Sequence, residues 1–347
     1  MLLAAQLVAL AWPAYACGCG GMVPGDRSRI AVEQESSVVG WDGRTEQILM
    51  SLTVGGDAEE AAWIMPVPHR ATVRLGDSRV FAQLNRLMAP ELRERHYFWP
   101  RPGDWPFADS GGVAASEDGA PKSPVKVVGR ERLGPFDVAR LTATDPEALR
   151  GWLRDNGFAL PDRLADELSP YVEREWEYVA VRLAPGSRDE GDVLDGTLDP
   201  LHLTFASDKL VYPMRLSRAA SLPQRLGLYV LAPHRMRPSS AIGGDEPKLR
   251  FAGRLDEPPG AVRRFAGGAA EKGVFLTVYN QYFPVPERIS GDHQLRRAHS
   301  DSAFRPVIDD DDLLTWGGVP AWVVTLLAAL AAVAVCVRRW SRRRRHP

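Results

Sequence analysis

The stretch WGGVPAWVVTLLAALAAVAVCV, residues 316–337, decides how the rest of the chain is arranged. It contains no charged residue and is almost wholly apolar. An α-helix rises about 1.5 Å per residue, so about 20 such residues cross a hydrocarbon core of about 30 Å. A helix also pairs its backbone N–H and C=O groups internally, which a lipid environment demands. The stretch therefore predicts one transmembrane helix over residues 316–337, in direct contact with membrane lipid.

The charges on either side of this stretch predict its orientation. Four aspartates, 309–312, precede it, and six arginines follow it within the tail, residues 338–347. Positively charged flanks stay in the cytoplasm. We therefore expect a single-pass protein of the plasma membrane with its large N-terminal part outside and its basic tail inside. The residues expected at the membrane interface are Trp316, Trp322, Arg338, Arg339, Arg342, Arg343, Arg344 and Arg345.

Residues 1–16 have the pattern of a secretory signal peptide. A short apolar run leads to Ala14 and Ala16, the small residues at the third and first positions before a cut ahead of Cys17. One element is missing, because no Lys or Arg precedes the run. A lipoprotein signal with Cys17 as the lipidated residue is the alternative, although the third position before the cut is then usually Leu. Both interpretations predict export.

The composition is that of an ordinary globular protein without an affinity for nucleic acid. Of 347 residues, 45% are hydrophobic and 25% are charged. The net charge is −1, and six arginines lie in the tail, so residues 1–337 carry a net charge of −7. An acidic outer part gives no electrostatic support for binding a polyanion. We therefore expect no nucleic-acid partner.

Residues 17–290 are expected to form one domain rich in strands. Alternating or apolar runs between Pro- and Gly-rich turns predict the strands, with Asp42-Gly43 as a hairpin turn. Pro66 and Pro68 restrict the strand that contains them to a sheet edge or a strand end. Helices are expected at 78–88, 145–156 and 162–175. Because strands and helices do not alternate as βαβ units, the sequence predicts an α+β fold with antiparallel sheet and a few short helices.

Two further segments lack a pattern of regular structure. Residues 108–124 are rich in Gly, Ala, Ser and Pro, and we expect a flexible insertion there. Residues 291–315 are polar and acidic, and we expect a stalk between the domain and the membrane.

Cys17 and Cys19 are the cysteines of the expected outer part, because Cys336 lies in the apolar stretch. One interpretation is a disulfide between them, which closes a very short loop and stabilises little. A second is a metal or redox site, although a structural metal needs more ligands than two cysteines. Unpaired thiols or pairing with another chain is the third. The sequence leaves all three open.

Trp63, Trp99 and Trp105 are the candidate binding aromatics. Residues 97–107, YFWPRPGDWPF, form the most aromatic stretch outside the expected membrane helix. Loops of aromatic residues and proline can bind peptides or sugars. The same side chains can equally cover the core of the domain.

Four stretches stand out as motifs: CGCGG at 17–21, WIMPVP at 63–68, LRGWLRDNGF at 149–158 and LVYPMRLS at 210–217. Together they resemble DUF2330, a bacterial family of unknown function. The resemblance implies an exported bacterial protein with the glycine–cysteine stretch at its mature end. It implies no established activity and no catalytic residues.

No catalytic signature is present in the sequence. G-x-S-x-G, a Gly-Lys-Ser/Thr phosphate loop and H-E-x-x-H are all missing, and the four aspartates lack the glycine and spacing of a calcium loop. We therefore expect no catalytic residue, no metal and no cofactor. The expected function is a binding or structural module of the cell envelope, with an envelope protein or polymer as partner. The alternative is an envelope hydrolase or a thiol-redox protein that uses Cys17 and Cys19.

Overall fold

The computed structural model describes residues 16–17, 20–25, 28–104, 137–141, 146–184 and 193–343. The chain divides into unit 1, Met1–Ala89 with Glu131–Arg305, and unit 2, Pro90–Arg130 with Pro306–Pro347. Several predicted features lie outside the described residues. They are the signal peptide up to residue 15, the insertion 108–124, Cys19, Trp105, Arg344 and Arg345.

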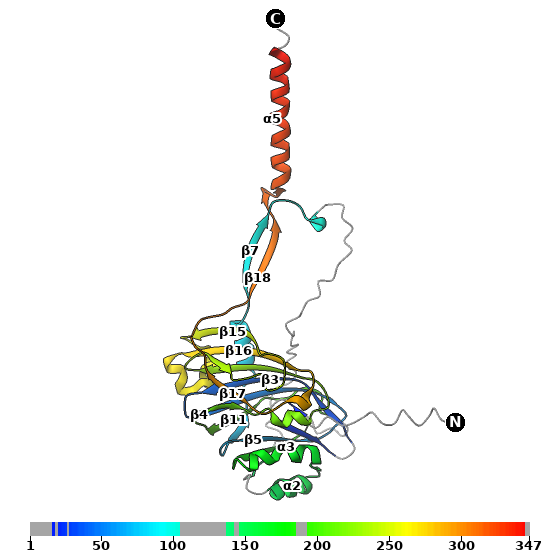
Figure 1. Ribbon diagram of the computed structural model, residues 1–347, viewed down its shortest axis with the longest axis vertical. Coiled ribbons are helices and arrows are strands. Elements are labelled where there is room, and N and C mark those ends of the chain that lie inside the picture. The colour runs from blue at the N-terminus through cyan, green and yellow to red at the C-terminus, as the bar shows by residue number, and fades with distance from the viewer. Residues whose placement is uncertain are drawn as a thin grey trace, which may run out of the picture. The chain divides into compact units, whose positions relative to one another are not determined.

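The largest element of unit 1 is an eight-stranded sheet (Figure 1). Its order is β15-β16-β13-β3-β4-β11-β6, and β10 pairs with β4. Every pairing is antiparallel except that of β3 with β13. The predicted hairpin joins β3 to β4, where Asp42 Oδ1 accepts the N–H of Thr45 at 2.7 Å and Gly43 has φ +100°. The strands are β3 (Ile30–Trp41), β4 (Thr45–Gly56), β6 (Thr72–Leu75), β10 (Gly196–Thr197), β11 (Leu201–Ala206), β13 (Gln224–Ala232), β15 (Lys248–Leu255) and β16 (Val274–Phe283).

A second, five-stranded sheet has the order β1-β2-β5-β9-β8. Its central strand carries Pro66, as predicted for a strand end: β5 pairs with β2 only from Ala61 to Ile64, and at Pro66 it has β9 alone as a neighbour. The missing N–H of Pro66 therefore costs no pairing to β2. The strands are β1 (Ala16–Cys17), β2 (Gly20–Pro24), β5 (Ala61–Val67), β8 (Asp137–Leu141) and β9 (Glu177–Leu183).

The main hydrophobic core lies between these two sheets. It joins Trp63 and Val181 of the five-stranded sheet to Ile48, Leu203 and Val230 of the eight-stranded sheet, all fully buried. Helices cover the outer faces: α2 (Pro146–Asp155) and α3 (Asp162–Val172) pack on the smaller sheet, and α1 (Arg79–Leu87) and α4 (Gly260–Ala266) pack on the larger one. Segregated helices on antiparallel sheets make unit 1 an α+β domain, as the sequence predicts.

A three-stranded sheet, β12-β17-β14, adds to the same core. Its strands are β12 (Leu210–Tyr212), β14 (Met236–Pro238) and β17 (His293–Arg297). β17 lies within the segment 291–315 that was expected to be a stalk, and it belongs to unit 1 because His293 and Leu295 are buried. The described residues also form four short 3₁₀ segments. Three lie in unit 1, η2 (Arg215–Ala219), η3 (Gly267–Lys272) and η4 (Pro286–Arg288), and η1 (Pro102–Asp104) lies in unit 2.

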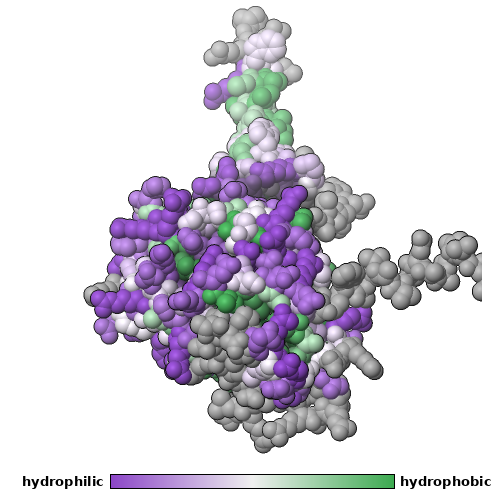
Figure 2. Space-filling view, turned by 60° about the horizontal axis from the view of Figure 1, so that its bottom comes forward, coloured by the Kyte–Doolittle hydropathy of each residue, from purple (hydrophilic) through white to green (hydrophobic). Residues whose placement is uncertain are grey.

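Unit 2 contains the predicted apolar helix, α5 (Ala321–Arg343). Its residues Ala321–Arg342 are the one helical segment in the described part of the chain that is long and apolar enough to cross a membrane, and its apolar side chains are exposed (Figure 2). The helix begins five residues later than expected. Gly317 and Gly318 have φ of +59° and +81°, and they turn the short hairpin of β19 (Thr315–Trp316) and β20 (Val319–Pro320).

The rest of unit 2 is a ribbon of two parallel strands, β7 (Glu91–Tyr97) and β18 (Val307–Leu313). The four aspartates 309–312 therefore lie on a strand, within the remainder of the segment expected to be a stalk. Backbone hydrogen bonds connect the ribbon to the helix. The N–H of Leu314 donates to the Tyr97 carbonyl, and the N–H of Ala321 donates to the Leu314 carbonyl.

Gly20 of the CGCGG motif has a packing role that can be tested. A Cβ at Gly20 would lie 2.5 Å from the Trp63 indole nitrogen and 2.6 Å from the Ile64 carbonyl oxygen. We expect Gly20→Ala to lower the free energy of unfolding by about 1–3 kcal/mol. Gly151→Ala is the control, because Gly151 lies on α2 with its nearest neighbour at 3.8 Å, and alanine should stabilise that helix by about 0.5–1 kcal/mol. Urea unfolding of the detergent-solubilised chain, followed by circular dichroism, measures both, and an unchanged Gly20→Ala protein would contradict this role.

His293 predicts a pH dependence of stability. Burial lowers the pKa of His293 from 6.5 to about 4, and its Nε2 lies 2.7 Å from Gln281 Oε1. The unfolded chain binds the proton first, so the folded state loses up to about 3 kcal/mol as the pH falls from about 6.5 to about 4. In His293→Gln, which keeps a donor for Gln281, urea unfolding curves recorded at pH 7 and pH 4 should show a loss smaller by this amount. The part due to His202, whose pKa burial also lowers to about 4, should remain. Equal pH dependence in both proteins would show that His293 is not responsible.

Candidate binding groove

The candidate site is a groove in unit 1 with a volume of about 530 Å³. It lies where the three-stranded sheet meets the ends of β3 and β13, so segments from four parts of the sequence line it. Ligand sites in proteins commonly measure about 300–1,000 Å³. The groove therefore has room for a few side chains of a bound molecule.

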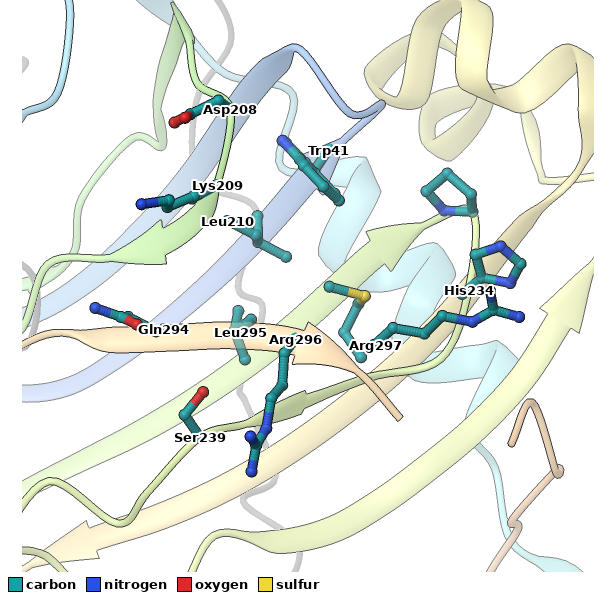
Figure 3. Close-up of a pocket in the computed structure, with 12 residues that line it drawn as sticks. Trp41, Asp208, Lys209, Leu210, His234, Ser239, Gln294, Leu295, Arg296 and Arg297 are labelled. Carbon is teal, nitrogen blue, oxygen red and sulfur yellow. The ribbon is translucent and has the colours of Figure 1, made fainter. Parts of the chain in front are cut away.

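The floor of the groove is apolar. It consists of the indole of Trp41, at the end of β3, with the buried side chains of Leu210, Met236 and Leu295 (Figure 3). The alternation of β17 explains why Leu295 reaches the floor while its neighbours Gln294 and Arg296 stay exposed. The Trp41 indole is fixed, because its Nε1–H donates to the Ser207 carbonyl at 3.2 Å.

The rim of the groove carries an excess of positive charge. Lys209, Arg296 and Arg297 line it, together with His234 and Asp208. Within the described part of the chain, Lys209 and Arg296 have no carboxylate within 4.0 Å. These two exposed cations are therefore available to a ligand.

A second feature makes Arg296 a suitable residue to bind an anion. In the antiparallel pairing of β14 with β17, Arg296 lies directly opposite Arg237. Like charges at directly opposed positions of a sheet repel each other. An anion bound beside Arg296 would reduce this repulsion.

A carboxylate outside the groove, that of Asp301, is bonded to the rim residue His234. Asp301 Oδ2 lies 2.8 Å from His234 Nδ1, and Asp301 Oδ1 accepts the backbone N–H of Arg235 at 2.9 Å. These hydrogen bonds, that of His234 first, lower the pKa of Asp301. Arg297 lies 4.0 Å from the same carboxylate, and Figure 3 shows its guanidinium beside His234. Asp301 thus lies beside His234 and Arg297 and not beside the rim cations Lys209 and Arg296.

The wall next to Trp41 is held by a buried acid. Glu46 lies opposite Trp41 in the pairing of β3 with β4, and its Oε2 accepts the backbone N–H of Val211 at 3.3 Å. Burial is the main cause that raises the pKa of Glu46 well above 4.5, so the side chain retains its proton where an exposed glutamate loses it. Glu46 therefore links the β3–β4 hairpin to the wall formed by residues 208–211.

Trp63 and Trp99, two of the aromatic residues selected from the sequence, do not line this groove. Trp63 is fully buried in the main core of unit 1, whereas Trp99 lies in unit 2 with 71% of its surface exposed. Cys17 ends β1, next to the buried β2, and Cys19 lies outside the described residues. The interface residue Trp316 is 52% exposed, and Arg338, Arg339 and Arg342 are exposed on α5.

The groove residues were not identified in the sequence. Trp41, Lys209, Met236 and Arg296 come from segments up to 255 residues apart, and β12 and β14 have only three residues each. These short and widely separated segments share no sequence signal. The described residues contain no group of three or more His, Cys, Asp or Glu side chains that could hold a metal ion.

Comparison with known proteins gives a family and no activity. A family model described as "Uncharacterized protein conserved in bacteria (DUF2330)" matches residues 13–296. No curated protein matches the chain. Among solved structures, the chain is similar to the crystal structure of baculovirus P35, with 11% sequence identity over 78% of this chain and 98% of that chain. The TM-score of 0.34 is too low to support an inference from that structure. Because the family match covers most of the 347 residues, the chain belongs to the uncharacterised bacterial family DUF2330.

Proposed function

We propose that the protein is anchored in the bacterial plasma membrane by α5 and carries unit 1 outside the cell. The observation behind this proposal is the exposed apolar surface of α5, which would be unstable in water. The orientation rests on the aspartates before the helix and the arginines after it. The signal-peptide pattern of residues 1–16 supports export of the same part of the chain.

We further propose that unit 1 is a binding module whose groove takes an acidic, extended peptide segment. The observation that carries this is the apolar floor of Trp41, Leu210 and Leu295 beside the uncompensated cations Lys209 and Arg296. A peptide can supply both an apolar side chain for the floor and a carboxylate for the rim. A charge-assisted hydrogen bond between one of these cations and a carboxylate is stronger than a hydrogen bond between neutral groups.

The geometry favours a peptide over an anionic wall polymer. A wall polymer would satisfy the cations of the rim, but its polar repeat would leave the floor without an apolar partner. An envelope protein with an exposed acidic segment fits both features. Of the two expected envelope partners, a protein or a polymer, we therefore propose a protein.

The proposed topology can be checked in intact cells with an epitope tag placed after Pro347. Protease added outside should remove unit 1 and leave a tagged fragment that contains α5 and the tail. The reason is that the bilayer protects residues on its cytoplasmic side. Loss of the tag in intact cells, with an internal cytoplasmic protein preserved, would contradict the topology.

The groove can be tested with an array of ten-residue peptides probed with the detergent-solubilised full-length chain. Peptides that combine Asp or Glu with Leu or Phe should bind best. Arg296→Glu should weaken their binding about tenfold, which is about 1.4 kcal/mol, because it replaces attraction by repulsion. Arg250→Glu is the matched control, since Arg250 is exposed on β15 away from the groove residues and should leave binding unchanged.

Two outcomes would count against the groove as the site. One is an equal loss of binding in the Arg296→Glu and Arg250→Glu proteins, which would indicate non-specific charge attraction. The other is binding of polyanions without apolar groups as tightly as the mixed peptides, which would favour a wall polymer.

A further inference from the structure

The ribbon of unit 2 lacks the support that small sheets normally have. Six of the seven residues in each strand are exposed, on both faces of the ribbon. Parallel pairs are slightly less stable than antiparallel ones, and isolated two-stranded sheets are marginal in water. Among the described residues, neither outer edge of the ribbon pairs with a third strand. The backbone N–H and C=O groups along the outer edge of β18 thus have no strand partner in the described part of the chain.

One face of the ribbon is electrically balanced. Asp309 accepts hydrogen bonds from Arg93 at 2.7 Å and from Arg95 at 2.9 Å. Asp311 on the same face accepts one from Arg101 at 2.9 Å. The carboxylates of this face therefore already have cationic partners.

The opposite face is acidic. Side chains alternate along each strand, so Glu94 of β7 shares this face with Asp310 and Asp312 of β18. Glu94 lies directly opposite Asp310, and like charges at such positions repel each other. Within the described residues, none of these three carboxylates has an arginine or lysine nitrogen within 4.0 Å. His96 lies opposite Asp312 on the same face.

We propose that an extended, basic segment of a partner protein adds to the outer edge of β18 as a third strand. Its backbone would satisfy the open edge, and Lys or Arg at every second position would lie beside Asp310 and Asp312. We place the partner strand at the edge of β18 and not at that of β7. The reason is that β18 contributes two of the three carboxylates of the acidic face, whereas β7 contributes Glu94 with His96.

The charges also determine which partner is excluded. A second copy of this chain would bring another acidic face against the first, which adds repulsion. The arginines of the balanced face are held by Asp309 and Asp311, so they are not available to a second copy. Charge complementarity therefore selects a basic partner.

The experiment uses the full-length chain in lipid nanodiscs and a fluorescein-labelled nine-residue peptide of alternating Lys and Thr. Fluorescence anisotropy should show binding of this peptide and not of the corresponding Glu–Thr peptide. The Lys–Thr peptide with every second backbone nitrogen methylated should bind at least about tenfold more weakly, because it cannot form the ladder of hydrogen bonds along β18.

Matched charge variants test the face. The triple variant Glu94→Gln, Asp310→Asn, Asp312→Asn should raise the Kd for the Lys–Thr peptide about tenfold. The reason is that it removes three exposed ion pairs between the acidic face and the lysines of the peptide. The control is Glu246→Gln, Glu257→Gln, Glu271→Gln, which removes the same charge from exposed positions of unit 1, leaves the ion pairs of the ribbon intact and should change the Kd less than about threefold.

Three results would overturn the proposal. They are equal effects of the two triple variants, equal binding of the methylated and unmethylated peptides by the unaltered chain, and self-association of the unaltered chain that the acidic-face variant strengthens without peptide binding. The peptide comparison uses the unaltered protein, so it remains valid if a variant fails to fold. Because the probe is basic, it also separates this surface from the groove of unit 1, whose proposed ligand is acidic.

Discussion

The structure of unit 1 depends on the shared core between its two main sheets. Each sheet has one face in this core and the other face under helices, so the strands at the centre are buried on both sides. All seven residues of β5 are buried, and Trp63 within it has no exposed surface. Burial on both faces explains why glycine is needed at position 20, where the backbone of β2 passes close to Trp63 and Ile64.

The same constraint accounts for the buried polar groups. The Tyr212 hydroxyl contacts Glu35 and lies 2.5 Å from the Ser37 hydroxyl oxygen, so these groups satisfy one another inside the core. Glu46 binds the backbone of Val211 and His293 binds Gln281. Each of these contacts joins a main sheet to β12 or β17, or to residues beside them. Polar pairs therefore fix the position of the small sheet, and the small sheet in turn forms the groove.

Charge is arranged differently in the two units. In unit 1, Lys209 and Arg296 lie beside an apolar floor and have no carboxylate within 4.0 Å among the described residues. In unit 2, the balanced and acidic faces of one ribbon result from the pleat of its strands, because consecutive aspartates alternate between faces. The four adjacent aspartates thus have two roles. Asp309 and Asp311 form ion pairs with arginines that stabilise the ribbon, and Asp310 and Asp312 are exposed to solvent.

The sequence by itself determined the class of fold, the hairpin at Asp42-Gly43, the three amphipathic helices and the apolar C-terminal helix. These features depend on local periodicity, on turn residues and on the length of an apolar run, all of which are properties of neighbouring residues. The family resemblance was also visible in four short motifs. The strand end at Pro66 followed from one missing N–H.

Only the tertiary structure decided where the candidate sites lie. The groove needs Trp41 beside Leu210, Met236 and Leu295, and the ribbon needs residues 91–97 beside 307–313. Neither pairing leaves a periodic signal, because both depend on contacts between residues far apart in the sequence: core packing for the groove, and ion pairs such as that of Arg93 with Asp309 for the ribbon. For the same reason Trp63 and Trp99, which look alike in the sequence, lie one in the core of unit 1 and one on the surface of unit 2.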